Sequence, residues 1–131
     1  MAIGDILNEE IERVAKIVVD SVFRVHSTLG PGLLESVYEN CLCLELQSRG
    51  LNVERQVVVP IIYLGNRIEP GLRLDVLVEG KIIIEVKSVE SMHPIFQSQL
   101  ITYLKLAQKR LGFLVNFNVP LIKDGIKRVI L

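Results

Sequence analysis

The stretch of sequence that decides the fold runs from Arg73 to Lys87 and reads RLDVLVEGKIIIEVK. Two apolar runs lie on either side of Glu79-Gly80, which predicts two β-strands joined by a tight turn. Three charged residues interrupt these runs: Asp75, Glu85 and Lys87. Because side chains alternate faces along a strand, Glu85 and Lys87 point the same way, and Asp75 on the neighbouring strand can face them.

Two carboxylates and an ammonium group on one sheet face are costly to bury unless their charge is compensated. A divalent cation would compensate them well, because hard cations prefer carboxylate oxygens. A cross-strand ion pair of Lys87 with Asp75 or Glu85 would also explain the pattern. The spacing alone supports the two interpretations about equally.

The composition indicates one globular domain over residues 1–131. The chain is 50% apolar and has few aromatic residues, so we expect an aliphatic core. No apolar run approaches the roughly 20 residues of a membrane span, and the first residues lack the basic flank and apolar centre of a signal peptide. We therefore expect a cytoplasmic protein that does not bind membranes. Cys41 and Cys43 lie two apart in a helical pattern, which predicts buried free thiols.

The net charge is zero, with 15 basic and 15 acidic residues. Acidic residues predominate before Lys81 and basic residues predominate from there on. A basic C-terminal half could form a phosphate-binding face, but lysines that solubilise helix and strand surfaces explain the same distribution, and on charge alone we favour the second explanation.

Hydrophobic periodicity predicts the order α-α-β-β-β-α-β-β. Beside the opening hairpin, we expect helices over 6–29, 33–48 and 94–110 and strands over 52–64, 113–117 and 126–130. Asp5 would cap the first helix, and Pro60 suggests an edge strand or a bulge. Three consecutive strands, a crossover helix and further strands describe an α/β (α+β) fold, with a mixed central sheet flanked by helices.

Apolar spacing predicts an inward face for each helix, which in the first consists of Leu7, Ile11, Val14, Val18, Val22 and Val25. The second helix would bury the row Leu34, Val37, Cys41 and Leu44, widened by Leu42 and Leu46. The third would turn Ile95, Leu100, Leu104 and Ala107 inward. On the second helix, Glu39 is expected to be solvated.

The arrangement of Asp75 followed by Glu85-Val86-Lys87 matches the Asp…(Asp/Glu)-x-Lys signature of the PD-(D/E)XK nuclease superfamily. Leu74 stands where that signature has proline, a position that varies. Within the superfamily, the chain closely resembles the small bacterial GxxExxY proteins over nearly its full length. The matching segments are Gly32-Leu33-Leu34-Glu35-Ser36-Val37-Tyr38, Arg73-Leu74-Asp75, Glu85-Val86-Lys87, Gln99-Leu100-Ile101-Thr102-Tyr103 and Asn116-Phe117.

The resemblance implies a restriction-endonuclease-like core and a nuclease that uses Mg²⁺, with Mn²⁺ as a possible substitute. Asp75, Glu85 and the Val86 carbonyl would hold the metal. Lys87 would orient or help to deprotonate the attacking water and offset charge in the transition state. With the resemblance, the ion-pair interpretation becomes the weaker one.

Five further residues have a functional and a structural interpretation. Glu35 would be a catalytic acid near the metal, or an exposed helix glutamate. Gln99 and Tyr103 share a helix face; they would support Lys87 and contact the DNA backbone, or form a polar helix flank. Arg73 would bind a phosphate, or pair with Glu85 or another glutamate. His93 would contact substrate, or cap the third helix.

Two functions remain open at this point. The leading one is a Mg²⁺-dependent nuclease acting on DNA, as an endo- or exonuclease. The alternative is a catalytically silent nuclease-fold module that binds nucleic acid or a protein partner, which the neutral net charge and the lack of an added DNA-recognition element keep open. A homodimer is compatible with the aliphatic surplus.

Overall fold

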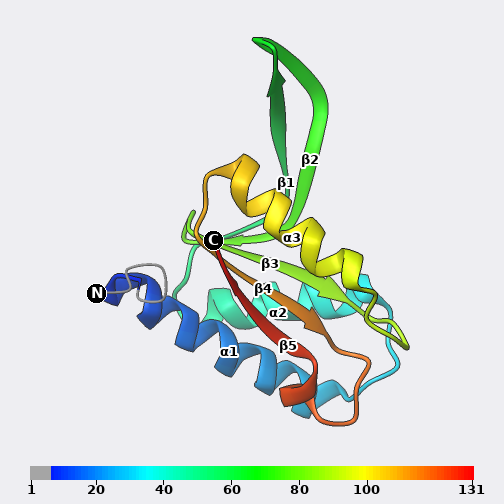
Figure 1. Cartoon of the computed structure of the whole chain (residues 1–131). Coiled ribbons are helices and arrows are strands. Elements are labelled where there is room, and N and C mark those ends of the chain that lie inside the picture. The colour runs from blue at the N-terminus through cyan, green and yellow to red at the C-terminus, as the bar shows by residue number, and fades with distance from the viewer. Residues whose placement is uncertain (1–6) are drawn as a thin grey trace.

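A computed structural model describes residues 7–131 as a mixed sheet between helices (Figure 1). The elements are α1 (Glu9–Leu29), α2 (Glu35–Ser48), β1 (Val53–Tyr63), β2 (Asn66–Val78), β3 (Ile82–Lys87), α3 (Pro94–Ala107), β4 (Leu111–Asn116), the 3₁₀ helix η2 (Ile122–Asp124) and β5 (Ile126–Ile130). The predicted order of helices and strands is therefore confirmed.

The five strands form one sheet in the order β1-β2-β3-β4-β5. Among the strands of residues 7–131, the β3–β4 pair is parallel and the other pairs are antiparallel, because α3 carries the chain across one face of the sheet between β3 and β4. Helices α1 and α2 cover the other face (Figure 1). The result is a mixed sheet of the restriction-endonuclease-like type, with a helix layer on each side.

Apolar residues fill both layers. The larger cluster joins α1 and α2 to Val76, Val78, Ile84 and Val86. The smaller cluster joins α3 to neighbouring strand positions such as Leu77 and Ile83. Because neighbouring strand positions enter opposite clusters, β3 is buried on both faces, and a charged residue in this strand is surrounded by core.

Strands β1 and β2 continue beyond the sheet as a long two-stranded arm, drawn in green in Figure 1. The register shifts between Val59 and Ile61, around Pro60, so the predicted irregularity at this proline is confirmed. The segment from Glu69 to Gly71 lies opposite it on β2. A Cβ on Gly71 would collide with the β1 backbone at Val59 and Ile61, so the close approach of the two strands requires glycine here.

Several local predictions need correction. On α2 the buried residues are Tyr38, Glu39, Leu42, Cys43 and Leu46. The predicted row was wrong at Leu34, Val37 and Leu44, which are exposed. The inward position of Ile95 was also wrong.

The helix boundaries differ as well. Helix α3 ends three residues earlier than predicted, and β4 begins at Leu111. Asn8 caps α1 through its side chain, whereas the proposed cap Asp5 lies outside the described residues.

Both cysteines are free, and Cys43 is buried while Cys41 is half-buried. Burial raises the pKa of the Cys43 thiol to about 11, so it stays protonated and unreactive. In the part of the chain that the structure describes, no helix is long and apolar enough to cross a bilayer.

Candidate active site

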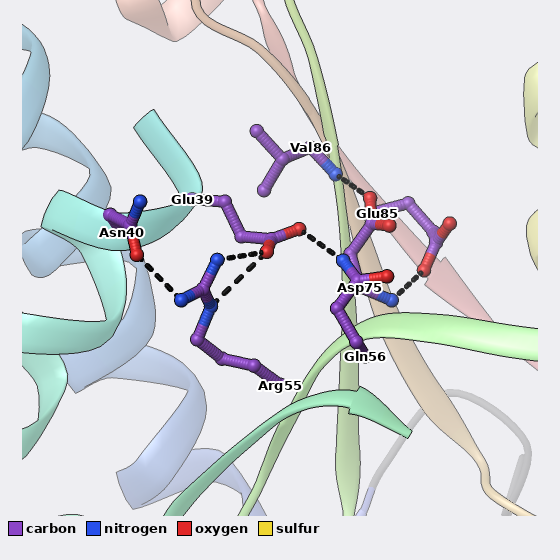
Figure 2. Close-up of polar contacts among 7 residues, drawn as sticks. All are labelled: Glu39, Asn40, Arg55, Gln56, Asp75, Glu85 and Val86. Carbon is purple, nitrogen blue, oxygen red and sulfur yellow. Dashed lines mark hydrogen bonds and ion pairs between the residues drawn. The ribbon is translucent and has the colours of Figure 1, made fainter. Parts of the chain in front are cut away.

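The site forms where β2 and β3 separate. Their last backbone pair on this side is Val76 with Ile84. One step further, the side chains take over the pairing: the Asp75 N–H donates to Glu85 Oε2 at 3.0 Å, and the Val86 N–H donates to Asp75 Oδ2 at 2.9 Å (Figure 2). Both carboxylates thus stand opposite each other at the fork between two strands.

An open cleft of about 450 Å³ lies at this fork. Its walls come from the arm, from the two strands and from α3. They are formed by Ile61, Gly71, Leu72, Arg73, Asp75, Glu85, Lys87, Gln99, Thr102, Tyr103 and Leu106. Gln99 Nε2 donates to the Tyr103 hydroxyl at 2.9 Å, so these two residues present one polar surface from α3. A second open cleft adjoins the first at Asp75 and Arg73, and Glu35 lines it.

The electrostatics of the fork favour a cation. Burial, followed by the negative charge of Asp75, raises the pKa of Glu85 to about 8. Burial also raises the pKa of Asp75, against the opposing effect of the Val86 N–H. Burial likewise raises the pKa of Glu35, which Lys87 partly offsets. These carboxyl groups are therefore poorly compensated as anions by the protein itself.

Lys87 reaches the cleft without neutralising either acid directly. Its Nζ lies over the Phe96 ring, 4.4 Å from the centroid, which is a cation–π contact. The ion pairs found among residues 7–131 involve neither Lys87, Asp75 nor Glu85. The simple cross-strand ion pair is thus not what this geometry contains.

Glu35 is the first residue of α2, and a fixed loop presents it. The Tyr38 hydroxyl donates to Gly30 O at 2.5 Å and accepts the Leu33 N–H at 3.1 Å. The Tyr38 ring stacks on Phe117, with centroids 4.5 Å apart. Tyr38 is therefore a structural clamp on the loop that precedes Glu35.

The same loop is also bound to the end of β3. The Ser88 hydroxyl donates to Leu33 O at 2.6 Å, directly after Lys87. The direction of Glu35 is consequently fixed relative to the strand that carries Glu85 and Lys87.

The remaining candidates divide in two. Arg73 is exposed and lines both clefts. It takes part in none of the ion pairs found among residues 7–131. His93 caps α3, where its Nδ1 accepts the Ile95 N–H at 3.0 Å, and it lines a separate hollow near β5. The structure therefore does not bring His93 to the cleft. His26 is buried, and its Nε2 forms a hydrogen bond with Val119 O at 2.8 Å, so it joins α1 to the segment before η2.

A polar network behind Asp75 was missed from the sequence. It contains Glu39, Asn40, Arg55 and Gln56 (Figure 2). Glu39 was expected to be solvated, but it is 6% exposed. The sequence offered one indication of this burial: Glu39 lies next to Tyr38 and three residues before Leu42, both of which are buried on α2.

The donor set suits a hard divalent cation in kind. Each acid at the fork spends one oxygen on a backbone N–H, which leaves its other oxygen for a ligand. Within residues 7–131, however, no three Asp, Glu, His or Cys side chains converge as a complete metal cage. Mg²⁺ tolerates such a site, because it usually keeps several waters and binds through one or two carboxylates.

Comparison with known proteins agrees with this arrangement. A family model described as the PD-(D/E)XK nuclease superfamily matches residues 12–129, which contain the fork and the whole sheet except the last residue of β5. No curated protein and no solved structure gives a significant match. With a matching family model over most of its length, the chain belongs to the PD-(D/E)XK nuclease superfamily.

Proposed function

We propose that this protein, a single nuclease-like domain over residues 1–131, hydrolyses phosphodiester bonds of DNA with the help of Mg²⁺. The observation that carries the proposal is the fork itself. Asp75 and Glu85 face one another from diverging strands, poorly compensated, in an open cleft that also contains Lys87. A structural ion pair does not explain two acids that face each other without a partner cation, whereas a metal-dependent hydrolase uses such a pair of acids as metal ligands.

The proposed metal ligands are the free carboxylate oxygens of Asp75 and Glu85 and the carbonyl of Val86. Water and phosphate oxygens would complete the coordination. When bound, Mg²⁺ (or Mn²⁺) makes a coordinated water more acidic and offsets the negative charge of the phosphate. The raised pKa of Glu85, which burial and then Asp75 cause, means that cation binding must displace a proton near neutral pH.

The proposed catalytic work of the protein falls to Lys87 and Glu35. Lys87 orients the attacking water or helps to remove its proton, and its ammonium offsets charge on the phosphate oxygens. Contact with the Phe96 ring restricts where that ammonium can lie. Glu35 stands across Asp75, at the start of α2, and its carboxylate acts on the water or on a second cation.

The proposed substrate contacts are Gln99, Tyr103 and Arg73. Gln99 and Tyr103 form one hydrogen-bonded surface on α3, suited to the DNA backbone. Arg73 lies between the two clefts and can bind a phosphate from either. The segment from Gly32 to Tyr38 further supports the narrower assignment to the GxxExxY proteins. In this chain, the Tyr38 hydroxyl fixes the loop before Glu35.

The test is cleavage of single-stranded, duplex and branched DNA with Mg²⁺ or Mn²⁺. Asp75→Ala and Lys87→Ala should each lower the rate at least about 100-fold, as expected for loss of a group that acts in the transition state. Lys81→Ala is the matched control, because Lys81 is an exposed lysine at the opposite end of β3. A wild-type protein that binds these DNAs but cuts none of them would refute the nuclease.

That outcome would instead favour a silent nuclease-fold module that binds nucleic acid or a protein partner. The balanced charge of 15 basic and 15 acidic residues is the observation that favours this second function, since a protein that holds DNA non-specifically usually carries excess basic charge, which a module that binds a protein partner does not need. Binding that persists in Asp75→Ala and Lys87→Ala would support it.

A further inference from the structure

Behind the fork lies a second buried acid. Among the residues that the structure describes, Glu39 and Glu85 are the buried acidic side chains. A carboxylate inside a protein is costly unless it is paired and hydrogen-bonded. Glu85 is explained by the cleft, whereas Glu39 points from α2 toward β1, and its burial needs its own explanation (Figure 2).

Both oxygens of Glu39 are committed to β1. Oε2 accepts two bonds from Arg55, from Nη2 at 2.6 Å and from Nε at 3.1 Å, and Oε1 accepts one from Gln56 Nε2 at 2.8 Å. Arg55 Nη1 also donates to Asn40 Oδ1 at 2.5 Å. Helix α2 thus holds two consecutive residues of β1, and each oxygen of Glu39 already accepts at least one hydrogen bond from them.

Those two residues lie at an irregular point of β1. Arg55 pairs with Val76 and Val57 pairs with Leu74, which places Gln56 across from Asp75. Gln56 has φ 51, a left-handed conformation that is unfavourable for a residue with a Cβ and persists only where the surroundings hold it.

Strand β2 changes the face that it presents to each helix layer at the same point. Val76 packs in the cluster under α1 and α2, whereas Leu74 packs in the cluster under α3. Val76 and Leu74 lie two positions apart on β2, and a regular strand would place both side chains on the same face. Asp75 lies between them, across from Gln56, at the point where β2 changes face.

We propose that Glu39 is a positioning residue for Asp75: it holds Gln56 and Arg55 at the turn in β1, and this turn fixes the Asp75 carboxylate at the fork. Glu39 and Gln56 line the second cleft beside Asp75, but the role proposed for Glu39 is to act through Gln56 and not to bind substrate or metal. Its effect on DNA cleavage rests on the proposed function, but its effect on the position of Asp75 does not.

The electrostatics agree with a side chain held close to Asp75. Burial raises the pKa of Asp75, the negative charge of Glu39 adds to this rise, and the Gln56 side chain opposes it. The competing explanation is a plain anchor between a helix and the sheet. Glu12 and Arg128 form such an anchor between α1 and β5, at 2.7 Å, and their ion pair provides a matched control.

The experiment follows one hydrogen bond by amide exchange in the metal-free protein. The Val86 N–H donates to Asp75 Oδ2, so its exchange rate reports where that carboxylate lies. Glu39→Ala and Gln56→Ala should each speed exchange at Val86 about tenfold, the loss of one typical hydrogen bond. Glu39→Gln should restore part of the protection, because its amide oxygen can still accept from Gln56.

Two comparisons make the result decisive. The double variant of Glu39→Ala and Gln56→Ala should exchange no faster than either single variant, because both act through one contact. Glu12→Ala should leave Val86 unchanged. Unchanged Val86 exchange in Gln56→Ala, which alters an exposed side chain and leaves the core intact, would overturn the proposal, as would an equal effect of Glu12→Ala.

The catalytic consequence is measured separately. If the wild type cleaves DNA, Glu39→Ala and Gln56→Ala should lower kcat about tenfold with little change in KM, since substrate contacts on α3 are untouched. A change confined to KM would contradict the positioning role. If the wild type cleaves no DNA, the proposed function fails, and the Val86 exchange still decides whether Glu39 positions Asp75.

Discussion

The Glu85 carboxylate accepts the backbone N–H of Asp75 at 3.0 Å, across the point where their strands part. Each acid therefore replaces a backbone bond that the separating strands have lost. This arrangement keeps the two carboxylates close together in the wall of the cleft, where burial and their mutual repulsion disfavour the charged forms.

Stability without metal should fall as the pH rises. Burial and then the charge of Asp75 raise the pKa of Glu85 from 4.5 to about 8, so between these values the folded protein holds a proton that the unfolded chain has released. The stabilisation is complete below the unfolded pKa and is lost as the pH rises through the folded one. We expect the free energy of unfolding to drop by a few kcal/mol between about pH 5 and about pH 9 in EDTA, measured with urea.

The variant Glu85→Gln isolates this effect. It keeps the shape of the side chain and removes its titration, so its stability should vary much less over the same pH range. Glu45→Gln is the control, because Glu45 lies in an ion pair with Arg49 away from the fork. An equally steep decline in Glu85→Gln would show that another group controls the pH dependence.

The Tyr38 hydroxyl should matter for both stability and activity. Tyr38→Phe keeps the stacking on Phe117 but removes the bonds to Gly30 O and from the Leu33 N–H. Loss of these bonds should cost about 1–3 kcal/mol, measured by urea unfolding. It should also lower DNA cleavage, because the loop that presents Glu35 becomes less fixed.

Tyr63→Phe is the matched control for this change. Tyr63 is 66% exposed at the end of the arm, so loss of its hydroxyl should leave stability within about 0.5 kcal/mol of the wild type. Equal stabilities of Tyr38→Phe and Tyr63→Phe would contradict the clamp.

Much of the fold could be predicted because its signals are local. The two apolar runs around Glu79-Gly80 do form a hairpin, and the turn places both Glu79 and Gly80 in the left-handed region. Pro60 coincides with the irregularity in the first strand for the same reason: a residue without an N–H limits pairing wherever it stands.

The rest depended on contacts that the sequence does not contain. Helix α2 has apolar residues on more than one side, so periodicity could not decide whether Leu34 or Leu42 faces the sheet. Glu39 is buried only because Arg55 and Gln56 meet it from β1, 16 and 17 residues away. The left-handed conformation of Gln56 has no sequence signal, because glutamine rarely adopts it without tertiary support.

Asn116 should hold the segment that follows Lys87. Its Oδ1 accepts the N–H groups of Val89 and Asn118, each at 3.1 Å, and its Nδ2 donates to Val89 O at 3.0 Å. Asn116→Ala leaves these backbone groups unpaired, which should cost about 2–4 kcal/mol. DNA cleavage should fall as well, because the end of β3 loses its support.

The control for this change is Asn66→Ala. Asn66 is exposed and makes one side-chain bond, to Leu64 O at 3.2 Å. Its loss should have little effect on unfolding by urea. If Asn116→Ala unfolds at the same urea concentration as Asn66→Ala, then Asn116 does not support this segment.

Gly71 should determine the shape of the arm wall beside the cleft. A Cβ in Gly71→Ala meets β1 backbone atoms at Val59 and Ile61, which cannot move individually, so the strands must separate. We expect a loss of about 1–3 kcal/mol on urea unfolding and faster amide exchange at Ile61. KM for DNA should also rise, because Ile61 and Gly71 line the cleft.

The control is Gly65→Ala, at the turn of the same arm. It strains a left-handed residue (φ 78) that has open space around it, so its effect should remain local and leave KM unchanged. Equal KM values for the two variants would show that the arm base does not shape the cleft.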